Sequence, residues 1–376
     1  MTPSVELLAV GDIILGPDGD RLMEHARPLL QKADVAIGQL EVTYTEKDEH
    51  AVSLGRIPQN LMPLARAGLD AVTLAGNHVA DYGREGLEDT MRWLSQHGIG
   101  FVGAGMNLDE ARKPLILERK GTRIGILNYN CVGPAETWAG TERPGNAYIR
   151  VITHYELDHA NPGGPPKAYT WAEPVTMGMM EEDIRKLRPR CDVLIVALHK
   201  GLVHTPVKLL EYEYQVSHAA VDWGADLVLS HHAHILKAVE RYKGKAIFHG
   251  LGNGFVYLPA QALSTGNVPE DWAGRRKTLF GFEPDPDYPT YPFHPEAKYT
   301  MIAKCVIERQ AIARVAFLPA YICPDGRMEL PGRTERGKEM LAYMRRITSA
   351  AGLSTRYEWS GDEVEVVGDD VSSYSS

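Results

Sequence analysis

The sequence predicts an α/β fold built on a mainly parallel sheet. Short apolar runs of strand length alternate with amphipathic stretches of helix length from the N-terminus onward. Several apolar runs end in a glycine or another small residue, followed at once by a side chain able to bind a metal. In open α/β sheets the carboxyl ends of strands are where ligands bind. The pattern therefore predicts both the fold and a site at one edge of its sheet.

The elements follow from this alternation in chain order. In the first hundred residues we expect strands at 6–10, 34–40, 70–75 and 99–103, with helices at 20–31, 59–67 and 84–96 between them. Strands at 114–118 and 123–130, joined by a short turn, predict an antiparallel hairpin at which the sheet becomes mixed. The remaining expected strands are 192–198, 225–230, 246–253, 299–308 and 311–319, and the remaining helices are 181–187, 207–223 and 334–350.

We expect one catalytic domain over residues 1–361. Two segments rich in Pro, Gly and aromatic residues, at about 132–180 and 255–295, show weak periodicity and predict ordered insertions that wall or cover a site. Residues 362–376 are acidic and then serine-rich, which predicts a tail that is disordered at its end.

Composition excludes some classes of function. The formal net charge is −9 and no long basic run occurs, so we expect no nucleic-acid partner. No signal peptide is recognisable and no apolar run reaches membrane-spanning length, which predicts a cytoplasmic protein without a membrane span.

The candidate ligands lie at the ends of separate expected strands and are spread over more than 200 residues of sequence. They are Asp12 in AVGD, Glu41 in GQLE, Asn77 and His78 in AGNH, His199 in ALHKG, and His232 and His234 in SHHAH. Taken singly, a Gly-Asp after a strand is usually a turn or helix cap, whereas two histidines spaced as HxH can serve one metal. Together they predict a metal centre.

In combination, these motifs resemble the calcineurin-like metallophosphoesterase superfamily, which has GD, GNH and GHxH motifs in this order. GDIILG, the LE of the second motif, LHKG, HHAHILK and FHGLGN resemble more narrowly its CapA-like branch, named after proteins of poly-γ-glutamate capsule synthesis. The resemblance covers residues 5–350. It implies a four-layer α/β/β/α sandwich with mixed sheets.

The resemblance also implies roles for the candidate ligands. Glu41, Asn77, His199 and His232 would form one metal site. Asp12 and His234 would belong to an adjacent site, with Glu41 able to bridge the two. His78 would stand beside the centre as a proton donor or electrostatic stabiliser.

Two departures from the superfamily pattern affect the chemistry. The usual first motif is DxH, but Asp12 is followed by Ile13 and Ile14, so the adjacent site lacks an imidazole. The second motif has Gln39 and Leu40 before Glu41, in place of GDxxD or NLE. Phosphoester hydrolysis of this kind relies on two metals, whereas one divalent ion can still stabilise an enolate. The departures favour carbonyl chemistry.

The leading hypothesis is a metal-dependent acid/base enzyme that acts on a peptide, similar to the peptide epimerases of lasso-peptide biosynthesis in the same branch. Asp12 and His294, the latter in the aromatic segment YPFHPE, would exchange the Cα proton from opposite faces. The expected cofactor is one or two divalent ions (Mn, Zn, Fe or Ca), with no organic cofactor. The alternatives are a metallohydrolase of phosphoester or amide bonds, with His78 as proton donor, and a non-enzymatic role in polymer synthesis or export. The oligomeric state stays open.

Overall fold

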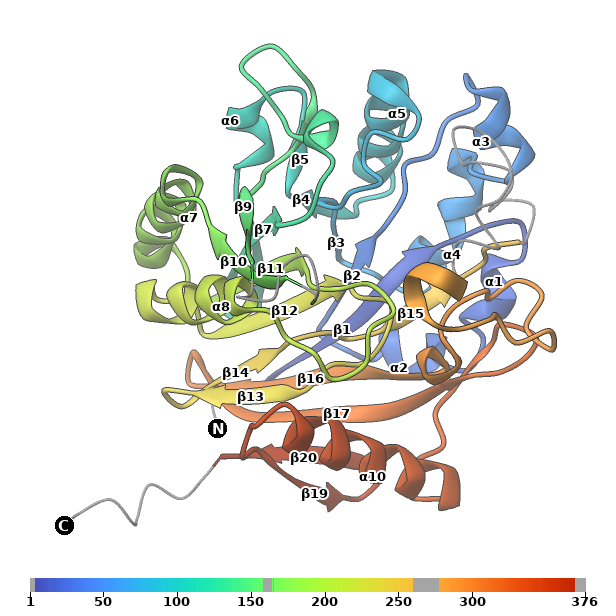
Figure 1. The fold of residues 1–376 in the computed structure, drawn as a ribbon. Coiled ribbons are helices and arrows are strands. Elements are labelled where there is room, and N and C mark those ends of the chain that lie inside the picture. The colour runs from blue at the N-terminus through green and yellow to red at the C-terminus, as the bar shows by residue number, and fades with distance from the viewer. Residues whose placement is uncertain (1–3, 158–163, 165, 260–276, 369–376) are drawn as a thin grey trace.

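Two β-sheets form the centre of the computed structural model, which describes residues 4–157, 164, 166–259 and 277–368 (Figure 1). The larger sheet has the strand order β19-β20-β17-β16-β1-β2-β3-β4, with β15 beside β1 and β18 beside β17. The second sheet has the order β13-β14-β12-β11-β7-β6. Two further sheets have two strands each: one pairs β9 with β10, and the other pairs β5 Ala104–Gly105 with β8.

The larger sheet is parallel at one end and antiparallel at the other. β1 pairs in parallel with β2 and β15, and in antiparallel with β16. Its strands are β1 Val5–Ile14, β2 Val35–Leu40, β3 Ala71–Thr73, β4 Gly100–Val102, β15 Asn253–Val256, β16 Tyr299–Glu308, β17 Ala311–Ile322, β18 Met328–Glu329, β19 Arg356–Ser360 and β20 Glu363–Val367. The acidic start of the predicted tail is therefore β20, while residues 369–376 lie outside the described residues.

The second sheet has four parallel central strands with an antiparallel strand at each edge. Its strands are β6 Leu115–Arg119, β7 Thr122–Asn130, β11 Val193–Lys200, β12 Leu227–His232, β13 Val239–Tyr242 and β14 Lys245–Phe248. The predicted hairpin is confirmed as β6 and β7. The predicted single strand over 246–253 is wrong: the chain leaves the second sheet after Phe248 and joins the larger one at Asn253, turning at Gly252 with φ of +73°.

Three apolar cores separate four layers. The inner core takes alternate side chains of both sheets, such as Leu7 of β1 and Ile195 of β11. A second core lies under helices on the outer face of the larger sheet, where Leu8 and Val10 of β1 point. The third lies between the second sheet and its own helices. This alternation of strand side chains between two cores confirms the predicted α/β/β/α sandwich with mixed sheets.

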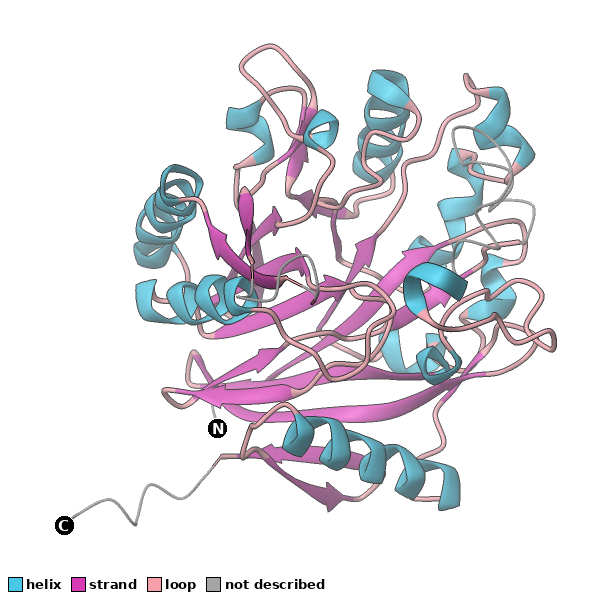
Figure 2. Cartoon of the chain, in the orientation of Figure 1, coloured by secondary structure: helices cyan, strands magenta, loops and turns pink. Residues whose placement is uncertain are grey.

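Helices cover both outer faces (Figure 2). The α-helices are α1 Gly19–Leu22, α2 Arg27–Leu30, α3 Glu49–Ser53, α4 Met62–Arg66, α5 Gly83–Gln96, α6 Leu108–Ala111, α7 Pro174–Leu187, α8 Glu211–Trp223 and α10 Glu335–Ala350. Short 3-10 helices are η1 Pro58–Leu61, η2 Ala135–Thr137, η3 Arg188–Arg190 and η5 Pro295–Lys298. In the described residues, no helix is both long and apolar enough to span a membrane.

Two predicted helices are shorter than expected because prolines interrupt them. The stretch 20–31 contains two separate helices, the second starting beside Pro28, and 59–67 divides into η1 and α4 beside Pro63. A proline has no N–H to donate and is tolerated in the first helical turn. The helix expected at 181–187 instead starts at Pro174, inside the first predicted insertion. That insertion also holds η2, β8 Gly145–Asn146, β9 Val151–Glu156 and β10 Lys167–Ala172.

Candidate metal centre

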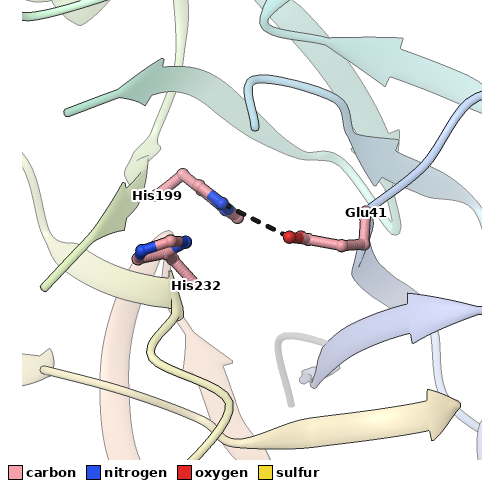
Figure 3. A group of neighbouring side chains, drawn as sticks. All are labelled: Glu41, His199 and His232. Atoms are coloured by element: carbon pink, nitrogen blue, oxygen red, sulfur yellow. Dashed lines mark ion pairs between the residues drawn. The ribbon is translucent and has the colours of Figure 1, made fainter. Parts of the chain in front are cut away.

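Side chains from four elements or their ends meet between the two sheets. Glu41 directly follows β2, Asn77 lies four residues beyond β3, His199 is the penultimate residue of β11, and His232 ends β12. Because β11 and β12 pair in parallel and in register, with Lys200 opposite His232, their carboxyl ends stop at the same edge. Figure 3 shows Glu41, His199 and His232 facing one common space.

The donor atoms are close enough to share one cation. Ligand atoms of Glu41, His199 and His232 all lie within 4.8 Å of one another. Asn77 Oδ1 lies 2.8 Å from His199 Nε2 and 3.1 Å from His232 Nδ1. In the part of the chain that the structure describes, no other set of three His, Cys, Asp or Glu side chains brings its ligand atoms this close. The structure thus brings together the four residues that were predicted to share a site, and we refer to these candidate ligands as the metal-binding group.

The chemistry of the group fits a divalent metal ion. Glu41 is 1% exposed, and within the described residues neither of its carboxylate oxygens has a hydrogen-bond partner. A buried carboxylate without a partner is costly, and a cation is the usual remedy. Burial lowers the pKa of His232 to about 3 and holds that of His199 well below its usual value. Both imidazoles are therefore neutral, the form that binds metals.

Asp12 and His234 form an adjacent polar pair. Asp12 is fully buried, its carboxylate lies 3.2 Å from His234 Nδ1 and 3.5 Å from His231 Nδ1, and the His232 N–H donates to it at 3.2 Å. Burial alone would raise the pKa of Asp12, but the neighbouring imidazoles of His231 and His234 hold it well below its ordinary value. Asp12 is thus an ionised carboxylate beside the metal-binding group.

The backbone around Asp12 differs from the expected strand end. Asp12 lies inside β1, at an irregularity in its register with both β2 and β15. Its N–H donates to Gly252 O at 3.1 Å, and a Cβ on the preceding Gly11 would lie 2.0 Å from that oxygen. The glycine of AVGD therefore permits the close approach of the FHGLGN segment.

Two residues outside the predicted ligand set, Asn253 and His231, contribute to the adjacent polar pair. Asn253 Oδ1 lies 2.8 Å from His234 Nδ1, and its amide nitrogen donates to Tyr291 Oη at 2.7 Å. Asn253 pairs directly with Asp12 across β15 and β1. The FHGLGN motif was the only signal for Asn253. His231 was visible as the first of two adjacent histidines, but nothing in the sequence showed that it would face Asp12.

His78 directly follows Asn77, and its side chain is 42% exposed. Its Nδ1 is 2.8 Å from Asp81 Oδ2. Burial around the ring lowers the pKa of His78, but Asp81 raises it more, to about 9. A protonated imidazole there is an available proton donor.

The described side-chain contacts of His294 are with Glu296 and Phe282. The His294 Nδ1 accepts a hydrogen bond from the Glu296 N–H at 3.1 Å, and this bond caps the N-terminus of η5. The His294 ring lies edge-on to that of Phe282, with centroids 5.1 Å apart. None of its hydrogen bonds or ring contacts within the described residues reaches the metal-binding group. Phe293, its neighbour, does pack on His234, with ring centroids 5.0 Å apart.

Both predicted insertions contact the centre. In the first, Asn146 Nδ2 donates to Gly76 O at 2.8 Å, directly before Asn77. In the second, Tyr291 and Phe293 are buried beside Asn253 and His234, while residues 260–276 lie outside the described residues.

The sequence of this chain matches a known protein family. The sequence model of a family described as bacterial capsule synthesis protein PGA_cap matches residues 6–256, which carry every residue of the metal-binding group. The chain belongs to this family. The CapA resemblance inferred from the motifs is thereby confirmed.

The curated relatives are distant in sequence. The chain is 26% identical over 265 residues to the capsule biosynthesis protein CapA of Bacillus anthracis, covering 66% of this chain and 58% of that protein. It is 26% identical over 263 residues to the PGA biosynthesis protein CapA of Bacillus subtilis (strain 168), covering 66% and 62%. The match therefore spans about three fifths of each relative.

Three solved structures resemble this chain with TM-scores below 0.5. A hypothetical protein from Thermus thermophilus has a TM-score of 0.48 at 13% identity, covering 84% of this chain and 98% of that one. A phosphatase from Mycoplasma pneumoniae has 0.45 at 14% identity, covering 88% and 92%. The calcineurin-like phosphoesterase YfkN from Bacillus subtilis has 0.37 at 14% identity, covering 92% and 98%.

Proposed function

We propose that this member of the PGA_cap family is a metal-dependent enzyme that performs acid/base chemistry on a peptide. One observation carries the proposal: Glu41, Asn77, His199 and His232 place two oxygens and two neutral nitrogens around one point, next to the ionised Asp12. Oxygen and imidazole donors suit several divalent ions, including Mn, Zn, Fe and Ca to different degrees.

A divalent ion held by these four side chains would supply Lewis-acid polarisation of a carbonyl or carboxylate oxygen. The chain's own residues do the rest. Asp12 carries the negative charge that a proton acceptor needs. His78 is partly exposed, and Asp81 raises its pKa so that it is protonated and can donate a proton. His232 is only half-buried, so a substrate can approach the group from its side.

The specific reaction we propose is epimerisation at a peptide Cα. Asp12 would remove the Cα proton, and His294 would return one from the opposite face. Its support is the incomplete second site: position 14, where the superfamily has an imidazole, is an isoleucine whose side chain belongs to the apolar core. A centre with one complete set of ligands is better suited to enolate stabilisation than to a two-metal displacement.

Deuterium exchange tests this reaction directly. Candidate peptides are incubated with the metal-loaded protein in deuterated water, and mass spectrometry and chiral amino-acid analysis follow each Cα. We expect deuterium and the opposite stereochemistry at one position, and neither with H199A. Unlabelled, unchanged peptides in the presence of bound metal would exclude epimerisation of those peptides.

Hydrolysis of a phosphoester or amide bond is the second candidate. The observation that favours it is the position of Glu41, whose Oε1 lies 3.5 Å from His199 Nε2 and 3.8 Å from His234 Nε2, between the two groups. A carboxylate there could bridge two metals, and His78 would protonate the leaving group. Two tightly bound ions per chain with turnover of an aryl phosphate would favour this reaction over epimerisation.

A role in polymer synthesis is the third candidate, because the relatives are named as capsule and PGA biosynthesis proteins. Calorimetry with poly-γ-glutamate, with and without metal, tests it. Tight binding without bond cleavage or stereochemical change would support a non-enzymatic role.

A further inference from the structure

The segment between β11 and α8, residues 201–210, brings a further histidine to the centre. His204 is 6% exposed, and its backbone N–H donates to Ala233 O at 2.9 Å, between His232 and His234. Its ring stacks on that of His234, with centroids 5.9 Å apart and an interplanar angle of 28°. Phe293 contacts both rings, at 5.6 Å from His204 and 5.0 Å from His234. His204 thus packs directly on a residue that faces Asp12.

A fully buried lysine holds the middle of this segment. Lys237 Nζ donates to Thr205 O and, at 3.0 Å, to Lys208 O. Burial lowers the pKa of Lys237 to about 8, so the ammonium keeps its charge at neutral pH. The ammonium therefore satisfies two carbonyls of a segment that itself forms no strand or helix.

A buried ion pair holds both ends of the same segment. Lys200 Nζ lies 3.2 Å from Glu213 Oε2, and the other oxygen of Glu213 accepts from the Leu210 N–H at 2.9 Å. Lys200 and Glu213 are both 0% exposed. Glu213 therefore connects the residue before Gly201 to the last residue of the segment.

Three buried charges around ten residues are expensive for a role in stability alone. Each buried ion costs several kcal/mol of desolvation, and apolar residues of similar volume would usually serve stability as well or better. Fixed geometry at a site is what such networks provide. The location of His204 identifies the geometry that is being fixed.

We propose that Lys237 and the Lys200–Glu213 pair form a buried clamp that fixes residues 201–210, so that His204 holds the imidazole of His234 in place. His234 then keeps Nδ1 on Asn253 and Asp12, and Nε2 toward Glu41. His204 and Lys237 are positioning residues, because they act through His234. The consequence for metal binding rests on the proposed function; the clamp itself does not.

The clamp is tested by amide hydrogen exchange of the full chain without metal. In K237M, which removes the ammonium and keeps an unbranched side chain one atom shorter, we expect exchange in residues 201–210, including the His204 amide, to rise roughly 10-fold or more. K208M is the matched control, since the Lys208 side chain is exposed on the same segment. E213Q is a second variant, expected to loosen the ends of the segment, and circular dichroism verifies that each variant is folded.

The effect on His234 is tested by titration with Mn²⁺ alone and Zn²⁺ alone. We expect H204A to weaken metal affinity roughly 10-fold, as for other residues that orient a metal site, and H204F to restore it by keeping the ring contact. Folded K237M and E213Q with unchanged exchange in 201–210 would overturn the clamp. Equal metal affinity in H204A and wild type would overturn the role of His204. A wild-type protein that binds no metal would refute the proposed function, and the exchange result would still decide the clamp.

Discussion

Asn77 Oδ1 and His199 Nε2 lie 2.8 Å apart, although they come from positions 122 residues apart in the chain. An amide oxygen can only accept, so at this distance the imidazole nitrogen either carries the proton or shares a cation with the oxygen. His232 Nδ1 faces the same oxygen at 3.1 Å. Two imidazole nitrogens are directed at one acceptor, and the neighbouring oxygens of Glu41 have no hydrogen-bond partner among the residues that the structure describes. This arrangement fits a shared cation better than two separate hydrogen bonds.

The first prediction concerns this amide. N77A removes an oxygen donor and leaves the backbone turn unchanged, so we expect metal affinity to fall at least roughly 100-fold, which corresponds to about 2.7 kcal/mol. Elemental analysis and calorimetric titration measure it, with H199A expected to behave in the same way. N60A, which removes an asparagine side chain that bonds to Gly55 O, is the control. Full affinity in N77A would remove Asn77 from the ligand set.

The second prediction concerns Glu41 in the metal-free protein. Burial, with the charge of Asp12 adding to it, raises the pKa of Glu41 to about 8, from an ordinary 4.5. Between these values the folded state binds a proton that the unfolded state has released, so the free energy of unfolding contributed by this group falls as pH rises from about 4.5 to about 8. E41Q cannot ionise. We expect it to exceed wild-type stability by a few kcal/mol at pH 8 and to match it near pH 5.

Urea denaturation in the presence of a chelator measures this difference across pH. E6Q is the control, since Glu6 lies at the opposite end of β1 from Asp12 and its side chain is 33% exposed. If the free energies of unfolding of E41Q and wild type changed in parallel from pH 5 to pH 8, the pKa of Glu41 would not be raised in the folded protein. With metal present the order should reverse, because the ion stabilises only the protein that can hold it.

Much of this centre could be predicted because its ligands are local to strand ends. Glu41, His199 and His232 each follow or end an apolar run, and a strand end is visible in the sequence. Asn253 could not be assigned in this way, because its position beside Asp12 depends on the chain crossing from one sheet to the other after Phe248. His204 was missed for a similar reason, since the buried Lys237 that holds its segment lies 33 positions away in sequence.

Where sequence reasoning went wrong on the fold, local chemistry explains it. The apolar spacing over 20–31 is helical, but Pro28 starts a new helix and does not continue the old one. Acidic composition predicts a tail over residues 362–376 outside the catalytic domain, whereas Val364 and Val366 alternate with glutamates and pack in the inner core as part of β20. Acidic composition concealed a period-two pattern.

The third prediction concerns His78 and its partner. Asp81 raises the pKa of His78 to about 9, against the opposing effect of burial. If His78 donates a proton during turnover, activity should decline above about pH 9 in the wild type, and D81N should move that decline to lower pH. A pH profile of kcat/KM, with NMR titration of the His78 ring, tests this. E85Q, which removes an exposed carboxylate from the first turn of α5, should leave the profile unchanged. A His78 ring that titrates identically in D81N and wild type would show that Asp81 does not raise the pKa of His78.

The last prediction separates the two roles open to Asp12. As a base, Asp12 is needed only for turnover, so D12N should keep its full metal content and lose activity by roughly 10²- to 10⁴-fold. As a ligand of a second ion, Asp12 is needed for stoichiometry, so D12N should fall from two bound ions to one. The substitution is nearly isosteric, and the His232 N–H can still donate to the amide oxygen. Elemental analysis of D12N beside wild type, with deuterium exchange on the same samples, distinguishes the outcomes.

The depressed pKa of Asp12 makes it a weak base in the free protein, so a base role also requires substrate binding to weaken its contacts with His231 and His234. Full activity in D12N would exclude Asp12 from both roles.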